Sequence, residues 1–358
     1  MRILMFSVNH PLKADGGQSE SLRGTHDGTH DYIIMCSRAN PMYRESGNYQ
    51  VYSLQDDQGG LSYKSIQLIH IYERYLQGQH FDLIHVYDAE VFRSAKYIRD
   101  KYLPGVKIVS TVQLSMYVWR RQRRHRAEWL SKDEQRLIAQ SDVVIVPSQY
   151  YADAYRVDFD RDDIIVLPNA VDRATPQEPV NLSLPPDGFN LGFVGRFAPQ
   201  KRSHWFFKNR IPDGINLHIW TMPFYQPVAE QMIAHFGSPG NYYMHGSLDL
   251  SHRQAVYESL DGVFFPSDHE SFGIGAMEAM EYGVPLICEQ HSGLASFVRY
   301  TNAWIWEPGE DLGELVGRIL HDPWRTEQKI LQGYETASRY DWSNTKHGVH
   351  EIYAQIVK

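Results

Sequence analysis

The sequence predicts two doubly wound α/β domains with a cleft between them. Short apolar or β-branched runs alternate with longer helical patterns along the 358 residues, a rhythm typical of parallel sheets with crossover helices. The alternation stops at 174–188, where four prolines fall within fifteen residues, and then starts again. A chain of 358 residues also exceeds what one hydrophobic core usually serves. We therefore expect a first domain at 1–173, a linker at 174–188 and a second domain at 189–342.

Each expected strand is a short run that would be buried on both faces of a sheet. In the first domain the strands are expected at 3–7, 32–36, 83–86, 107–111, 143–147 and 164–167. In the second domain they are expected at 191–194, 217–220, 242–245, 263–266, 286–288 and 304–306. The last segment, 343–358, has Val349, Ile352, Tyr353 and Ile356 at helical spacing, and it predicts an amphipathic helix that fits either domain.

Composition excludes several classes of protein. Hydrophobic residues make up 42% of the chain and aromatic residues 13%, which argues against disorder. A net charge of −8 argues against a protein that wraps nucleic acid, although a local basic patch is compatible with it. Cys36 and Cys288 lie far apart, and no signal segment precedes the first expected strand, so we expect a reducing, cytoplasmic location. No apolar run approaches the roughly 18 to 20 residues that cross a bilayer, so any membrane association would be peripheral.

The most informative stretch is 266–285. An apolar strand ends at Pro266, a loop containing glycine follows, and a helix is expected to open near Gly273. Backbone amides at such a helix start, at the carboxyl end of a strand, favour a bound phosphate. Glu278, about one turn into the helix, would then face a sugar ring, and Glu270 would lie nearer the far side of the phosphate. The alternative is a helix with two exposed carboxylates near its positive end.

A second stretch, 193–201, runs from an expected strand into Gly195, Arg196 and Lys201. Two fixed cations beside a helix-bound phosphate would stabilise a leaving diphosphate. At ~4 Å and an effective dielectric constant near 20, each contact contributes about 4 kcal/mol of gross Coulomb energy. Such an arrangement requires no metal ion. The alternative is a pair of solvated loop charges.

These two stretches, together with the sequence Pro-Asn-Ala-Val-Asp at 168–172, resemble glycosyltransferase family 4 in order and spacing. The pattern is Glu, seven residues, Glu, then Ala-Met and a Gly-Val-Pro turn. The resemblance extends over nearly the whole chain, through the segments 16–17, 82–85, 141–148, 169–170, 195–201, 257–267 and 270–278. It implies the GT-B fold of two facing Rossmann-like domains with an interdomain cleft. It also implies a nucleotide-activated sugar, transfer with retention of configuration, and a helix at 343–358 that returns to the first domain.

The resemblance assigns roles to individual residues. Glu278 would bind the nucleotide ribose, Glu270 the donor sugar hydroxyls, and Arg196 and Lys201 would neutralise the diphosphate. The glycines and loop amides implied in donor binding are Gly16, Gly17, Gly195, Ser271, Phe272 and Gly273. Glycines suit such places because a backbone without Cβ approaches a ligand closely. For the pair at 16–17 the alternative is an ordinary turn.

The sequence departs from the family at four places. Gln113 stands where members commonly carry a histidine, and its amide donates hydrogen bonds but does not titrate. The usual Asn-Gly turn is Asn169-Ala170, and the usual glycine after Lys201 is Arg202. A Trp-Thr-Met-Pro turn at 220–223 replaces a glycine-rich one. These changes bear on the identity of the donor rather than on the fold.

A basic segment follows Gln113. Five arginines occur within the seven residues 120–126, flanked by Trp119 and Trp129. Arginine suits phosphate oxygens, and tryptophan suits a membrane interface or stacked bases. The segment predicts an anionic acceptor, namely a glycan or lipid-linked glycan at the inner membrane surface, or modified nucleic acid. The alternative is a solvated basic helix face. The acceptor-side candidates are Gln113, Arg120, Arg121, Arg123 and Arg124.

Two weaker patterns are interpreted as surface loops. Thr25 to Asp31 has two histidines and two aspartates, but it fits a polar loop better than a metal site. Asp158, Asp160, Asp162 and Asp163 are interpreted as a solvated acidic turn.

The sequence as a whole therefore predicts a retaining, metal-independent glycosyltransferase without a cofactor, with a UDP-sugar favoured as donor. The leaving phosphate would take the acceptor proton, and the rival mechanism is a double displacement with Glu270 as nucleophile. Other classes are a GT-B-fold epimerase, a glycogen-phosphorylase-like enzyme, or a non-catalytic protein that binds sugar nucleotides. The phosphorylase-like class requires a pyridoxal-phosphate lysine, for which the sequence has no specific motif.

Overall fold

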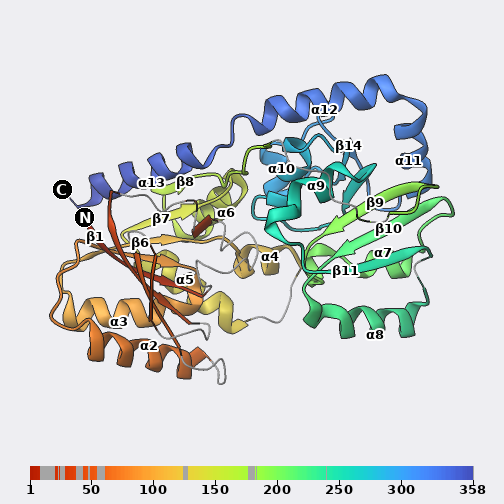
Figure 1. Ribbon diagram of the computed structural model, residues 1–358. Coiled ribbons are helices and arrows are strands. Elements are labelled where there is room, and N and C mark those ends of the chain that lie inside the picture. Colours follow the sequence, from red (N-terminus) through yellow and green to blue (C-terminus); the bar gives the residue numbers. More distant parts are fainter. Residues whose placement is uncertain are drawn as a thin grey trace. The chain divides into compact units, whose positions relative to one another are not determined.

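The computed structural model describes residues 1–8, 21–22, 24, 29–37, 43–46, 49–54, 61–123, 128–175, 182, 184–238 and 240–357. The chain forms two compact units, each built on one sheet (Figure 1). Unit 1 comprises 1–169 and 342–358, and unit 2 comprises 170–341. Of the linker expected at 174–188, residues 176–181 and 183 lie outside the described part.

The sheet of unit 1 has eight strands within the described residues, in the order β3-β4-β2-β1-β5-β6-β7-β8. Neighbouring strands are parallel except β3 and β4, which form an antiparallel pair at one edge. The strands are β1 (Arg2–Ser7), β2 (Asp31–Cys36), β3 (Tyr43–Ser46), β4 (Tyr49–Ser53), β5 (Leu83–Tyr87), β6 (Lys107–Thr111), β7 (Val143–Val146) and β8 (Ile164–Val166). The connections diverge between β1 and β5, and ligands of such sheets bind at the carboxyl ends of the strands beside this point.

Both faces of this sheet are covered, which explains why its central strands are largely apolar. Leu4 and Phe6 of β1 join the core beneath α2 and α3, whereas Ile3 and Met5 face the C-terminal helix α13 (Figure 1). The helices of unit 1 are α2 (Leu61–Tyr75), α3 (Phe92–Tyr102), α4 (Met116–Arg123), α5 (Glu128–Gln140), α6 (Gln149–Phe159) and α13 (Trp342–Ile356), with a short 3-10 turn, η1 (Ala89–Val91).

The helix α13 is joined to the sheet by a buried polar contact as well as by apolar packing. The Tyr353 hydroxyl lies 2.5 Å from Nδ1 of His85, and Nε2 of the same imidazole lies 2.8 Å from the Thr111 hydroxyl. His85 and Tyr353 have no exposed surface. Because a buried polar atom without a partner is costly, this contact fixes where the end of the chain docks on unit 1.

Replacing Tyr353 with phenylalanine is expected to lower the free energy of unfolding by about 1–3 kcal/mol, because His85 keeps its burial but loses a partner. Urea unfolding followed by circular dichroism measures this change. Tyr63→Phe is the matched control, since Tyr63 is 42% exposed on α2. Equal stability of Tyr353→Phe and the control would contradict a stabilising role for the buried contact.

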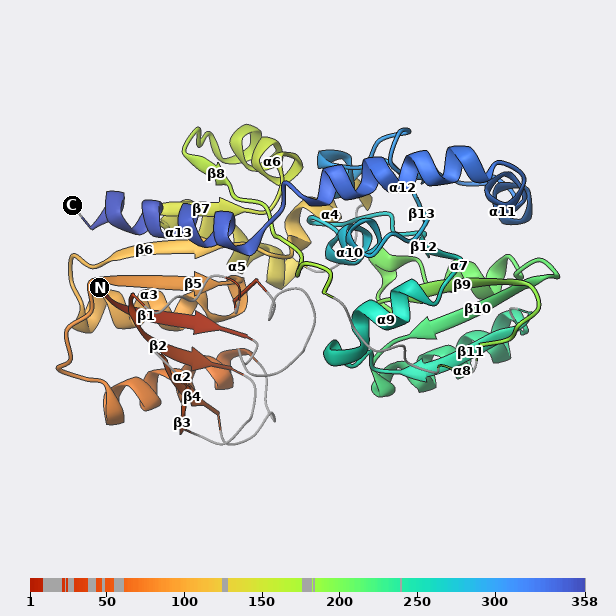
Figure 2. The ribbon, with the colours of Figure 1, turned by 45° about the horizontal axis from the view of Figure 1, so that its top comes forward.

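Unit 2 contains a parallel sheet of six strands among the described residues, in the order β11-β10-β9-β12-β13-β14. Figure 2 shows β9, β10 and β11 side by side. The strands are β9 (Phe189–Val194), β10 (Ile215–Trp220), β11 (Tyr242–Gly246), β12 (Gly262–Phe265), β13 (Leu286–Cys288) and β14 (Trp304–Ile305). Here too the connections diverge, between the central strands β9 and β12, so the loops that follow these strands meet at one edge.

Helices cover both faces of this second sheet. The helices α9 and α10 pack on one face with Val263 and Phe265 of β12, while α7, α8 and α11 pack on the other with Phe264. The helices are α7 (His204–Lys208), α8 (Gln226–Phe236), α9 (Arg253–Glu258), α10 (Ile274–Glu281), α11 (Leu312–His321) and α12 (Pro323–Ala337). Where the structure describes unit 2, it also has four 3-10 turns: η2 (Pro199–Lys201), η3 (Pro223–Tyr225), η4 (Leu250–His252) and η5 (Ser292–Ser296).

The prediction of two parallel-sheet α/β domains is confirmed, and each of the twelve expected strands is present within two residues of its expected bounds. The antiparallel pair β3–β4 was not expected. The segment Tyr43–Ser46 reads Tyr-Arg-Glu-Ser, which carries no apolar run, because a strand at a sheet edge does not need two buried faces.

Candidate functional site

The two motif-bearing loops of unit 2 meet at the carboxyl edge of its sheet. One loop follows β9 and the other follows β12, and these strands are parallel neighbours. The Gln200 carbonyl accepts hydrogen bonds from the amides of Asp268, at 3.0 Å, and His269, at 3.4 Å. The loops that the sequence singled out separately therefore form one site.

Lys201 and Glu270 form an ion pair at the centre of this site. The Lys201 ammonium donates to both carboxylate oxygens, at 2.6 and 2.7 Å. Burial of Glu270 favours its protonated form, but the charge and hydrogen bonds of Lys201 outweigh burial and hold the pKa of this carboxyl below its usual value. An ammonium has three N–H donors. The third has no acceptor among the described residues, so Lys201 retains one donor for a ligand.

The loop between Glu270 and α10 presents backbone donors. Gly273 precedes the helix at φ 103°, a conformation that glycine adopts readily and other residues rarely do. No described residue accepts a hydrogen bond from the amides of Ser271, Phe272 or Gly273. Free amides at the positive end of a helix form a ready anion-binding site.

The alternative interpretation of Glu270 and Glu278 as exposed carboxylates is wrong, because they are 7% and 5% exposed. The carboxylate of Glu278 forms an ion pair with Arg253 of α9, and its Oε2 accepts a hydrogen bond from the Tyr257 hydroxyl at 3.0 Å. Sequence reasoning did not single out Arg253 as a site residue. The available signal was its position one helical turn before Tyr257, which places both side chains on one face of α9.

The second expected cation, Arg196, lies on the surface of unit 2 and has no ion pair or hydrogen bond within the described residues. Lys201 is less exposed and is paired with Glu270, so the alternative of a solvated loop charge does not apply to Lys201. Gly195 donates from its amide to the Trp220 carbonyl at 3.0 Å, which joins the ends of β9 and β10. Arg202 adopts φ 48°, which explains why glycine suits this position, and its guanidinium pairs with Glu289.

In unit 1, Gln113 is buried at the carboxyl end of β6. Its amide nitrogen donates to Ser21 at 2.7 Å and to Asn169 at 3.1 Å, while its amide oxygen accepts from Asn169 at 2.8 Å. Both N–H donors of the side chain are thus engaged inside the unit. Arg120, Arg121 and Arg123 belong to α4, but their side chains lie outside the described part, as do Arg124, Gly16 and Gly17 altogether.

The start of α4 is nevertheless fixed by hydrogen bonds to buried side chains. The buried Glu134 carboxylate accepts from the Ser115 hydroxyl and, at 3.0 Å, from the Tyr117 amide. The Ser115 hydroxyl oxygen accepts from the Val118 amide at 2.9 Å, which caps the helix. These contacts fix the direction in which the arginine-bearing helix leaves the sheet edge.

The two weaker patterns have no ligand-binding geometry that the structure describes. The acidic residues at 158–163 lie at the exposed end of α6 and in the following turn, and Arg161 pairs with Asp163. Residues 25–28 of the polar loop lie outside the described part. Within the described residues, no group of three or more His, Cys, Asp or Glu side chains is arranged to hold a metal ion.

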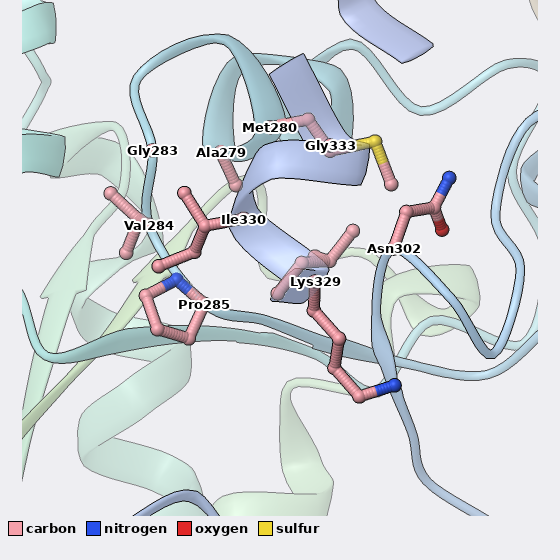
Figure 3. Close-up of a pocket in the computed structure, with 10 residues that line it drawn as sticks. Ala279, Met280, Gly283, Val284, Pro285, Asn302, Lys329, Ile330 and Gly333 are labelled. Atoms are coloured by element: carbon pink, nitrogen blue, oxygen red, sulfur yellow. The ribbon is translucent and has the colours of Figure 1, made fainter. Parts of the chain in front are cut away.

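A small pocket of unit 2 lies between α10 and α12 (Figure 3). Its residues are Ala279, Met280, Gly283, Val284, Pro285, Leu286, Asn302, Lys329, Ile330 and Gly333. The Lys329 ammonium donates to the carbonyls of Tyr300 and Ala303, and the Asn302 amide donates to the Phe297 carbonyl. None of the residues assigned to donor binding lines this pocket. Its polar side chains, Lys329 and Asn302, donate hydrogen bonds within unit 2. We therefore interpret the pocket as a small gap in side-chain packing.

The helices within the described residues include none that is both long and apolar enough to cross a membrane.

Comparison with family models places the whole site within known families. Residues 22–175 match the model described as Glycosyltransferase Family 4, and residues 176–336 match the model described as Glycosyl transferases group 1. Among curated proteins, the chain is similar to a D-inositol 3-phosphate glycosyltransferase of Xylanimonas cellulosilytica, with 24% identity over 250 residues. That alignment covers 63% of this chain and 60% of the relative. A protein of the same description from Corynebacterium urealyticum is 30% identical over 108 residues, 28% of this chain and 25% of the relative.

Solved structures share the fold. Sucrose-phosphate synthase from Thermosynechococcus elongatus superposes with a TM-score of 0.86 at 19% identity, covering 99% of this chain and 98% of that one. The HepE protein of Anabaena, in complex with UDP-glucose, superposes with a TM-score of 0.74 at 15% identity, covering 99% of each chain. The expected fold class, GT-B with two Rossmann-like α/β domains, is thereby confirmed.

Proposed function

The chain belongs to glycosyltransferase family 4, and from this membership we propose that it transfers a sugar from a nucleotide diphosphate sugar to an acceptor hydroxyl with retention of configuration. The observation that carries the proposal is the Lys201–Glu270 pair beside the free amides of Ser271, Phe272 and Gly273. These groups combine a fixed cation with donors aimed at an anion, which is what a departing diphosphate requires.

In the proposed step, the bond between C1 of the sugar and the diphosphate oxygen breaks while the acceptor oxygen bonds to C1 on the same face. The acceptor proton passes to the departing phosphate oxygen, so a nucleoside diphosphate leaves. The free N–H of Lys201, the exposed guanidinium of Arg196 and the loop amides would stabilise the charge that develops on that oxygen. Glu270 holds Lys201 in place and would accept from the donor sugar's hydroxyls.

The contacts of Glu270 argue against the rival double displacement. Both of its carboxylate oxygens accept from Lys201, so the two side chains form a buried ion pair. A covalent ester of Glu270 with C1 would carry no charge and would leave the Lys201 ammonium without its counter-charge. We therefore assign Glu270 to binding and positioning, and a covalent sugar adduct on Glu270 would overturn this assignment.

Two similarities support the choice of substrates to test first. The Anabaena structure contains UDP-glucose, which supports a UDP-sugar as donor. The curated relatives are described by an acceptor that carries a phosphate, which supports an anionic acceptor. The arginines 120, 121, 123 and 124 are the proposed acceptor-side cations, because arginine binds phosphate oxygens through paired N–H groups.

The test compares two buried glutamates of one helix. Glu278 and Glu281 both lie on α10 and both pair with an arginine, Arg253 and Arg173 respectively, but Glu278 alone is proposed to bind the donor. Glu278→Gln is expected to weaken UDP binding about 10- to 100-fold, which corresponds to one lost charged hydrogen bond, whereas Glu281→Gln keeps wild-type affinity.

The measurement is calorimetric titration with UDP, GDP and ADP, followed by hydrolysis assays with their sugars. Saturation at about 100 times the dissociation constant would stabilise the fold by roughly 2.7 kcal/mol, which a thermal-shift assay detects. Absence of binding to all three nucleotides, or equal losses in the two variants, would contradict the proposed donor site.

A further inference from the structure

Arg253 is a buried arginine that the proposed mechanism does not use. It is the first residue of α9, and its residue surface is 5% exposed. Arginine is rarely buried in proteins unless it is paired, because removing a guanidinium from water is costly. The burial of Arg253 therefore indicates that a carboxylate inside unit 2 requires its positive charge.

The carboxylates that pair with Arg253 are those of Glu278 and Asp172. One terminal nitrogen forms the ion pair with Oε1 of Glu278, and the other donates to Asp172 at 3.1 Å. Tyr257, four residues later on α9, donates its hydroxyl to Oε2 of Glu278 at 3.0 Å. One face of α9 thus supplies a separate donor to each oxygen of the same carboxylate.

This arrangement defines both the charge and the direction of Glu278. An ionised carboxylate accepts hydrogen bonds and donates none, and a buried carboxylate stays ionised only beside a counter-charge. Two donors on two oxygens also fix the plane of the carboxylate. Each oxygen of a carboxylate has two lone pairs, so a donor from α9 on each oxygen is compatible with a ligand hydroxyl on the same oxygen.

The geometry points to Arg253, assisted by Tyr257, as the positioning residue that makes Glu278 selective for the adjacent hydroxyls of a ribose. This inference rests on the proposed function, because it takes Glu278 as the residue that meets the nucleotide. Two neighbouring hydroxyls donate to a fixed, ionised carboxylate, whereas a deoxyribose leaves one oxygen without its donor. The ligand class selected is therefore a ribonucleoside diphosphate over its 2′-deoxy counterpart.

The test measures a ratio of affinities rather than one affinity. For the wild-type protein, UDP is expected to bind at least about 10-fold more tightly than 2′-deoxy-UDP, since a site built to pair a hydroxyl rejects an analogue without it. In Arg253→Met the ratio is expected to fall to within about 3-fold, because the carboxylate loses its counter-charge and its fixed plane. Arg253→Lys is expected to restore most of the ratio, because it returns a cation to Oε1.

Arg173→Met is the matched control. Arg173 pairs with Glu281, which lies on α10 as Glu278 does but is not part of the proposed donor site. Its ratio is expected to equal that of the wild type. If Arg253→Met does not fold, Tyr257→Phe decides the question, because it removes a single hydroxyl from Oε2 and is expected to lower the ratio severalfold.

The outcomes separate this inference from the proposed function. If Arg253→Met weakens both ligands equally, or if Tyr257→Phe leaves the ratio unchanged, the contacts from α9 have only a structural role. Either result overturns this inference and leaves the proposed donor site intact. Failure of the wild-type protein to bind UDP, GDP or ADP overturns the proposed function, and this inference with it.

Discussion

Replacing Lys201 with methionine is expected to lower the transfer rate and the stability of unit 2 together. The rate falls because one fixed donor to the leaving phosphate is lost, which costs on the order of 10²–10³ in kcat where such donors have been removed. The free energy of unfolding falls by about 3–5 kcal/mol because Glu270 is left as a buried charge without its partner. Steady-state assays and urea unfolding measure the two effects separately.

The neighbouring cation provides the contrast. Arg196 is exposed and unpaired within the described residues, so Arg196→Met is expected to lower the rate with a change in stability within about 0.5 kcal/mol. The double variant Lys201→Met, Glu270→Gln removes the unpaired charge and should recover stability but not activity. A Lys201→Met protein that is fully active, or a double variant that regains the rate, would show that the ion pair has a purely structural role.

The fold could be predicted because buried parallel strands need side chains that are apolar on both faces. Internal strands such as Val143–Val146 and Leu286–Cys288 therefore carried a strong signal, and they lie within one residue of the bounds expected for them. The edge strand β3 lacks this requirement, so its residues carried no comparable signal. Its neighbour β4 reads Tyr-Gln-Val-Tyr-Ser, which also contains no continuous apolar run. Strands could thus be predicted from the local sequence pattern wherever both of their faces are buried.

The site was predictable only in part, because its contacts join residues far apart in the chain. The sequence indicated that Lys201 and Glu270 belong to one site, but not that they bind each other across 69 positions. It likewise singled out Glu278 but not the guanidinium of Arg253, 25 positions earlier. Such pairs depend on how β9, α9 and α10 are placed by the sheet, and no local pattern encodes that placement.

The close approach of two loops in unit 2 makes Gly293 the position where a single methyl group is expected to do most damage. A Cβ at Gly293 would lie 2.2 Å from the Ser271 carbonyl oxygen and 2.7 Å from that of Glu270. Both neighbours are backbone atoms, so they cannot rotate away as a side chain would. The loop that presents Glu270 and the free amides would have to shift.

Gly293→Ala is therefore expected to lower kcat/KM about 100-fold or more, since a displacement near 1 Å of a positioned group costs on that order. Overpacking should also lower the free energy of unfolding by about 1–3 kcal/mol. Gly317→Ala is the matched control, because a Cβ at Gly317, within α11, meets nothing within 4 Å. Alanine there should stabilise the helix by about 0.5–1 kcal/mol and leave the rate unchanged. A fully active Gly293→Ala enzyme would mean that catalysis does not depend on the position of the 270–273 loop, and the proposed donor site would have to be sought elsewhere in the chain.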